Sequence, residues 1–341
     1  MQKQLTEGKL LVNGKLAEAG YSTKTVRHYC RKDIKGLKWR IKEWDYYIVT
    51  DGKKAVALTV ADNSYMSMAS VSFLDFINPK FKTTSEIKFF SLGKLNMPSC
   101  PEEGDVRYRS KKVQISIERK ENCRILKCKY KNFWDKTDFE CELTLTDFPR
   151  DQMTIATPFH KPRAFYYNTK INCMKASGYC IVKGERLEFS PENSLGTLDW
   201  GRGVWTYKNT WYWSSLQTRL EDGRTFGFNL GYGFGDTTAA SENMLFVDGI
   251  AHKLDRVTFE IPTKKGKDDF LSPWKFRDNE GRLNLDFVPI LDRKDITDLG
   301  ILASKQHQVF GKFSGTVVLD DGQKLELTNL LGFAEKVTNK W

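Results

Sequence analysis

A segment of twenty residues, GTLDWGRGVWTYKNTWYWSS (196–215), places four tryptophans and two tyrosines beside Asp199 and Arg202. Burial among indole rings removes water from a carboxyl group, which raises its pKa and suits it to donate a proton near neutral pH. Arg202 opposes this effect because a nearby cation stabilises the carboxylate. The segment therefore predicts either a catalytic acid, Asp199, with Arg202 as its modulator, or an Asp199–Arg202 ion pair that only braces a loop.

The rings around this pair have two interpretations. Trp205, Trp211 and Trp213 are the expected walls of a ligand site, since aromatic faces attract cations and could stabilise a developing carbocation. Cross-strand aromatic pairs also stabilise sheets by roughly 0.2–1 kcal/mol each, so the same rings could be plain core.

The dipeptide Asp222-Gly223 predicts a tight hairpin after the tryptophans. A two-residue turn pairs residues whose numbers sum to about 445, so that Trp213 faces Tyr232 on an aromatic side. Tyr212 then lies opposite Gly233 on a second side that is small and polar, where space for a ligand is expected. A longer loop would exchange these faces.

Polar residues on and after the second strand of this hairpin are candidates to orient the polar end of a ligand or a water molecule. They are Asn229, Asp236, Glu242, Asn243 and His252. Each of them, taken alone, is equally typical of a turn cap or a surface charge.

Several other chemistries lack a recognisable pattern. The four histidines have no metal-binding spacing, so we expect no metal, and GYGFG lies late in a strand rather than before a helix, so we expect no dinucleotide cofactor. There is no G-x-S-x-G motif for a nucleophilic serine. Carboxylates are therefore the expected chemistry.

The composition is that of a globular protein: 341 residues, 40% of them hydrophobic. Lys and Arg number 54 against 43 Asp and Glu, but the excess is dispersed, so no nucleic-acid partner is predicted. Seven cysteines without a CxxC pair favour reduced thiols. No apolar run is long enough to span a membrane, and the first twenty residues do not resemble a signal peptide, so we expect a cytoplasmic protein without stable membrane insertion.

Short alternating segments such as VQISIE (113–118), CRILKCKY (123–130) and FECELTLTDF (139–148) predict antiparallel strands, and Asp-Gly turns recur between such runs. Consecutive antiparallel strands hide their edges by closing or curling. The expected fold is all-β, with two tandem lipocalin-like barrels or strongly curved sheets. We place the domains at 1–193 and 194–341, with the seam near SPENSLG (190–196).

Five motifs carry a family resemblance over nearly the whole chain: KPRAFYYNTKINCMKASG (161–178), LDWGRGVWTYKNTWYW (198–213), GYGFGD (231–236), SENMLFVDGIAHKL (241–254) and PWKF (273–276). Together they resemble the bacterial family called domain of unknown function 2804. More distantly, Asp199-Trp200-Gly201 and its surroundings are similar to the carotenoid hydratase, kievitone hydratase and tocopherol cyclase group. That likeness implies tandem lipocalin-like barrels acting on isoprenoid-type molecules, often by protonating a double bond. Trp200 replaces the histidine that follows the aspartate in the hydratase motif, which puts the acid–base pair in question.

The expected function is to bind a hydrophobic small molecule, a lipid or isoprenoid, near the entrance of the second barrel. Acid-catalysed hydration, isomerisation or cyclisation would follow if Asp199 donates a proton. A non-catalytic lipid carrier and a structural β-protein with a filled interior are the alternatives.

Overall fold

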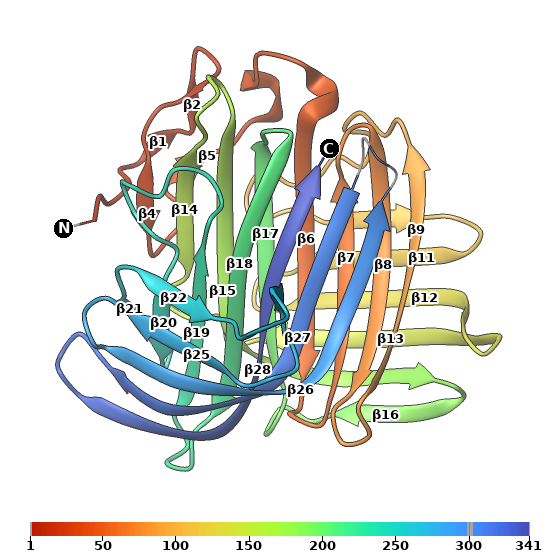
Figure 1. Ribbon diagram of the computed structural model, residues 1–341. Coiled ribbons are helices and arrows are strands. Elements are labelled where there is room, and N and C mark those ends of the chain that lie inside the picture. The colour runs from red at the N-terminus through yellow and green to blue at the C-terminus, as the bar shows by residue number, and fades with distance from the viewer. Residues whose placement is uncertain (1, 299, 301–302, 341) are drawn as a thin grey trace.

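The computed structural model describes residues 2–298, 300 and 303–340, and it is almost entirely β (Figure 1). Within these residues there is no α-helix, only the short 3-10 turns η1 (Arg31–Asp33) and η2 (Lys38–Arg40). Two large curled sheets account for most of the strands. The expected all-β class with two strongly curved sheets is confirmed.

The first sheet is antiparallel along its main path. Its order is β10 (Val106–Arg109), β11 (Val113–Arg119), β12 (Arg124–Trp134), β13 (Thr137–Thr146), β15 (Phe165–Val182), β17 (Leu195–Val204), β6 (Ile41–Thr50), β7 (Lys54–Asp62), β8 (Met66–Asp75) and β9 (Lys80–Phe89). Three further strands flank this path: β4 (Gly20–Ser22), β14 (Met153–Pro158) and β16 (Glu185–Phe189). Four two-residue strands, β1 (Gly8–Lys9), β2 (Leu11–Val12), β3 (Lys15–Leu16) and β5 (Arg27–His28), lie near the N-terminus.

The second sheet is also antiparallel and is built from the C-terminal part of the chain. Its order is β21 (Ile250–Lys253), β20 (Met244–Val247), β19 (Thr225–Tyr232), β18 (Lys208–Arg219), β28 (Lys324–Lys340), β27 (Ala303–Val318), β26 (Leu283–Asp298), β25 (Trp274–Asp278) and β22 (Val257–Glu260). A small ribbon of β23 (Thr263–Lys264) and β24 (Lys267–Asp268) completes the strands.

The chain passes from one sheet to the other between Val204 and Lys208. This is later than the seam expected at 190–196, because β17 pairs along its length with β6 and β15 of the first sheet. The aspartate and the first tryptophan of the motif therefore lie on a central strand of the first sheet.

Each sheet curls around its own apolar core, and two further apolar clusters fill the space between the sheets. In Figure 1, β18, β28 and β27 cross in front of β17, β6 and β7. The first half of β15 is buried on both faces, since one face points into the first core and the other toward the second sheet. Trp205, Trp211 and Trp213 of the motif lie between the two sheets, whereas Trp200 packs in the first core.

The predicted register of the tryptophan hairpin is wrong by one residue. Tyr212 pairs with Tyr232 and Trp213 with Gly231, because Leu220 and Arg224 close a three-residue loop in which Gly223 has a φ of +88°. The faces are therefore exchanged. The side of Trp213 carries Asn229 and Gly231, while Tyr212 stacks on Tyr232 with ring centres 4.5 Å apart.

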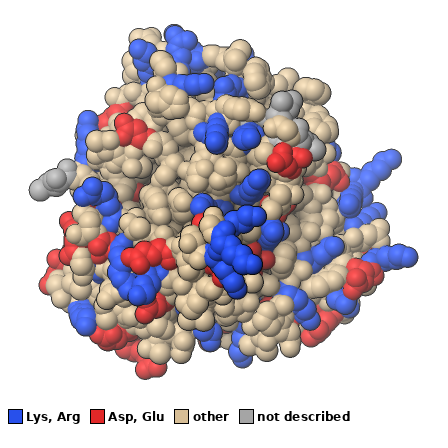
Figure 2. All heavy atoms as spheres, viewed as in Figure 1, with Lys and Arg blue, Asp and Glu red and all other residues tan. Residues whose placement is uncertain are grey.

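All seven cysteines are free thiols, as expected. Lys and Arg are scattered among acidic and neutral residues on the face seen in Figure 2, which agrees with dispersed charge. No helix in the described part of the chain has the length and apolarity needed to cross a bilayer.

Candidate functional site

Asp199 lies in the middle of β17 and points toward the second sheet. Its carboxylate accepts hydrogen bonds from Lys170 Nζ at 2.8 Å, Asn168 Nδ2 at 2.6 Å and Trp44 Nε1 at 3.2 Å. Register explains the arrangement, because Lys170 on β15 is directly opposite Asp199 and Trp44 lies diagonally across on β6. The side chain of Asp199 is 10% exposed. The carboxylate therefore has three donors, one of them cationic.

Arg202 takes no part in this arrangement. Residues three apart on a strand point to opposite faces, so Arg202 enters the first core while Asp199 leaves it. Arg202 is fully buried, pairs with Asp45 at 3.0 Å and lies 4.2 Å from the ring centre of Trp200. The expected Asp199–Arg202 ion pair does not form, and the structure separates Arg202 from the site that the sequence suggested.

The C-terminal part of the chain contributes two more carboxyl groups, one bound directly by an indole and the other through Asn229. Trp211 Nε1 donates to Glu335 Oε1 at 3.0 Å. Trp213 Nε1 donates to Asn229 Oδ1 at 2.7 Å, and Asn229 Nδ2 donates in turn to Glu242 Oε2 at 3.1 Å. The three indole N–H groups of Trp44, Trp211 and Trp213 thus bind three parts of one polar cluster.

Lys170 connects the two halves of the cluster. Its Nζ is 3.8 Å from the ring centre of Trp213, on the second sheet, while it pairs with Asp199 on the first. The Lys170 side chain is only 3% exposed. One buried ammonium group therefore pairs with Asp199, and its charge also acts on the carboxyl groups of Glu242 and Glu335.

Desolvation raises the pKa of two of these carboxyl groups, Glu242 and Glu335. Burial raises the pKa of Glu335 from 4.5 to about 7, against the opposing effect of the hydrogen bond from Trp211 and of Arg293 and Lys170. Burial likewise raises the pKa of Glu242, while Lys170 and the hydrogen bond from Asn229 lower it. A site in which one carboxylate forms an ion pair and a second carboxyl group has a pKa near 7 contains the parts of an acid–base pair.

An aromatic wall closes one side of this site. The ring of Trp44 stacks on Tyr166, with ring centres 5.9 Å apart, and meets Trp205 edge-on, with ring centres 5.1 Å apart. The ring centre of Phe234 lies 4.8 Å from that of Trp205 and 5.2 Å from that of Trp211. Trp44 and Trp211 are each partly exposed at the edge of the wall. The wall therefore combines packed rings with two solvent-accessible ones.

Two glycines make room for this arrangement. A Cβ on Gly201 would lie 1.9 Å from the Trp44 ring, and a Cβ on Gly231 would lie 2.6 Å from the Glu242 carboxylate. The absence of a side chain at Gly201 and Gly231 leaves the space that the Trp44 ring and the Glu242 carboxylate occupy. The space beside polar groups that we expected on this hairpin is present, but the protein's own side chains fill it.

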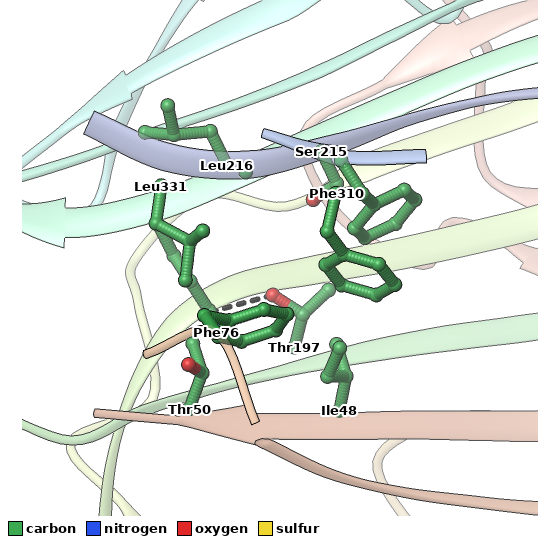
Figure 3. Close-up of a pocket in the computed structure, with 11 residues that line it drawn as sticks. Ile48, Thr50, Phe76, Thr197, Ser215, Leu216, Phe310 and Leu331 are labelled. Atoms are coloured by element: carbon green, nitrogen blue, oxygen red, sulfur yellow. Dashed lines mark hydrogen bonds between the residues drawn. The ribbon is translucent and has the colours of Figure 1, made fainter. Parts of the chain in front are cut away.

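A small cavity adjoins the cluster between the sheets (Figure 3). It measures about 20 Å³, enough for a single water molecule. Thr197 and Ser215 line it, each two residues along its strand from Asp199 and Trp213, and Thr197 donates a hydrogen bond to Gln217 at 2.6 Å. The other lining residues are mostly apolar, among them Ile48, Phe76 and Phe310.

The other predicted site residues lie apart from the cluster. Asp236 is exposed and binds Thr238 within its own turn, and Asn243 accepts from the backbone N–H of Gly231. His252 lies on β21, where its Nδ1 accepts from the backbone of Asp320, and Tyr212 faces the second core. Of the predicted residues, the structure brings together Asp199, Trp205, Trp211, Trp213, Asn229 and Glu242.

The sequence interpretation missed Lys170, Asn168, Trp44 and Glu335. Asn168 and Lys170 did leave a signal, since they alternate on one face of a long apolar strand, where a charge without a partner is costly. Trp44 and Glu335 come from strands far away in the sequence, and nothing local marks either of them.

Comparisons with known proteins agree with the fold. The family described as "Domain of unknown function (DUF2804)" matches residues 2–341, which confirms the resemblance expected from the motifs. A crystal structure titled as a candidate AttH from Nitrosomonas europaea is similar, with a TM-score of 0.54 and 13% identity over 92% of this chain and 98% of that one. Kievitone hydratase from Nectria haematococca has a TM-score of 0.48 and 11% identity, with 88% of each chain covered. A search of curated proteins finds no match to this chain.

Proposed function

We propose that this chain, which belongs to the DUF2804 family, binds a hydrophobic small molecule at the edge between its two sheets and transfers a proton to it. One observation carries the proposal: a buried Lys170–Asp199 ion pair lies in the same polar cluster as Glu335, whose pKa burial raises to about 7. General acids work best when their pKa is near the ambient pH.

The proposed donor therefore changes from Asp199 to Glu335. The Asp199 carboxylate binds Lys170, Asn168 and Trp44, so we assign it the role of stabilising a cation or accepting a proton from water. Glu335 is the group that holds a proton near neutrality, and Trp211 orients its carboxyl. These are the two roles that a hydration or an isomerisation needs.

A lipid or isoprenoid with a carbon–carbon double bond fits this chemistry. The partly exposed rings of Trp44 and Trp211 would bind its apolar body. Transfer of the Glu335 proton to one carbon leaves a carbocation on the other, near the aromatic rings and the Asp199 carboxylate. Addition of water, with loss of its proton to a carboxylate of the cluster, gives an alcohol. Loss of a neighbouring proton instead gives an isomer.

The test uses a lipid extract from the source organism, incubated with the protein in ¹⁸O-labelled water and analysed by mass spectrometry. Hydration is expected to give a product that carries the label, made by the wild type and lost in Glu335→Gln. Glu326→Gln is the matched control, because Glu326 is an exposed residue of the same strand, β28.

Isomerisation would be followed in the same way in deuterated water, through deuterium bound to carbon. Equal product from Glu335→Gln and wild type would refute the role of Glu335. If the protein extracts and retains a lipid without changing it in either solvent, the carrier function replaces the catalytic one.

A further inference from the structure

A second site lies at the mouth of the first sheet, on the opposite face of β15 from Lys170. Ile171 of β15 lines a hollow of about 690 Å³ there. Other lining residues come from the N-terminal segment 23–29, from 99–103, from 148–152 and from the β11–β12 hairpin. Ligand sites for small molecules measure roughly 300–1,000 Å³, so this hollow has the volume of a binding site.

Two arginines at the end of the β11–β12 hairpin dominate its chemistry. Arg119 and Arg124 pair directly across the hairpin, so both side chains are on one face. Both guanidinium groups lie over the ring of Phe148, at 4.1 Å and 5.7 Å from its centre. Two like charges close together on one ring repel each other, and an anion between them would relieve that repulsion.

Three other charged residues at the hollow already have partners, and Lys24 and Glu103 also line it. Arg27 pairs with Glu18 and Arg150 with Asp151, while Glu102 accepts hydrogen bonds from Thr25 and Gln152. Within the described residues, no carboxylate lies within 4.0 Å of Arg119 or Arg124. Arg119 donates instead to the backbone carbonyl oxygens of Glu102, Lys120 and Cys123, so neither guanidinium group forms a direct ion pair with a described residue.

Arg124 has a buried N–H group that lacks an acceptor among the described residues. Its side chain is buried, with only 2% exposed, and its Nη2 donates to the carbonyl oxygen of Pro101. Its Nη1 has no hydrogen-bond partner within the protein. A buried cationic N–H group without an acceptor is costly, and a bound anion would supply the acceptor.

We propose that this hollow binds a small amphipathic anion. Its carboxylate or phosphate group lies between Arg119 and Arg124, and its apolar part lies against Phe148 and Ile171. Arginine suits both head groups, because its planar donors match the oxygens of carboxylates and phosphates. The site does not depend on the proposed proton transfer, since it lies on the other side of the first sheet.

The test is titration calorimetry with four probes: decanoate, decyl phosphate, 1-decanol and inorganic phosphate. We expect one of the two anionic decyl compounds to bind with a stoichiometry of one, at least about tenfold more tightly than 1-decanol or inorganic phosphate. The two anionic compounds distinguish a carboxylate ligand from a phosphate ligand.

Variants locate the binding. Arg124→Met and Arg119→Met are each expected to weaken binding of the preferred probe by about tenfold or more, since each removes charge-assisted hydrogen bonds. Arg119 is less buried, so its variant keeps the test valid if Arg124→Met fails to fold. Arg256→Met, at a side chain that is 80% exposed, is the control and is expected to bind as wild type. Glu335→Gln is also expected to bind as wild type, which separates this site from the one between the sheets.

Two results would overturn the proposal. One is binding of 1-decanol as tight as that of both anionic compounds. The other is unchanged binding of the preferred probe by both folded arginine variants.

Discussion

Replacing Glu335 with glutamine should change how stability depends on pH. The native state holds the proton of Glu335 up to about pH 7, whereas an unfolded chain releases it near 4.5. Between these values the native state binds more protons, so the free energy of unfolding falls as pH rises. One pH unit is worth about 1.4 kcal/mol, so the stabilisation present below pH 4.5 shrinks by about 3 kcal/mol by the time the pH exceeds 7.

Glutamine cannot ionise, and it keeps the shape of the protonated acid. Its side-chain oxygen can accept from Trp211 Nε1, and a rotated Gln308 amide, whose oxygen lacks a partner in the structure, can accept from the new NH₂ group. Glu335→Gln therefore removes the loss of stability on ionisation without opening a cavity. Its stability relative to wild type should rise by about 3 kcal/mol from about pH 5 to about pH 9.

The assay is urea unfolding across this pH range, followed by tryptophan fluorescence and circular dichroism, with Glu326→Gln as the control. Glu326 is exposed, so its variant should keep a constant offset from wild type. If the unfolding free energies of Glu335→Gln and wild type, plotted against pH, stay parallel over the whole range, the argument that burial raises the pKa of Glu335 is refuted.

Three further predictions follow from individual contacts. Lys170→Met leaves the buried Asp199 carboxylate without its cation and should lower the free energy of unfolding by about 3–5 kcal/mol. The double variant Lys170→Met/Asp199→Asn should recover part of this loss in urea unfolding, and additive effects of the two substitutions would contradict the ion pair. Gly201→Ala places a methyl group against the Trp44 ring and should cost about 1–3 kcal/mol and shift tryptophan fluorescence, whereas unchanged stability would show that the ring has other room. Arg202→Met should destabilise the fold by about 3–5 kcal/mol, measured by urea unfolding, but leave ligand binding between the sheets intact, and selective loss of binding in a stable variant would return Arg202 to the site.

The sequence predicts the all-β fold well because its signals are local. Alternation along β11, β12 and β13 matches the buried and exposed sides of these strands, and the Asp-Gly pairs fall at turns. It misplaced the face of the hairpin because a loop one residue longer turns every side chain over. Nothing in the dipeptide Asp222-Gly223 itself distinguishes a two-residue loop from a three-residue one.

The site was only partly predictable for a related reason. The tryptophan-rich segment pointed to Asp199, Trp211 and Trp213, which do meet polar partners between the sheets. Their partners come from strands that pair or pack only in the folded chain, so Glu335 lies 124 residues from Trp211 in the sequence. The pairing of Asp199 with Arg202 failed because the segment is a strand rather than a loop, and the spacing of three places them on opposite faces.

The most direct test of the proposed proton transfer is the protonation of Glu335 in the folded protein. In protein labelled with ¹³C at glutamate side chains, the carboxyl resonance that disappears in Glu335→Gln belongs to this residue, and its chemical shift reports the charge. The account predicts a midpoint near pH 7 in the folded protein. A resonance that shows a fully ionised carboxylate from about pH 5 upward would contradict it, because no acid would then be poised between the sheets.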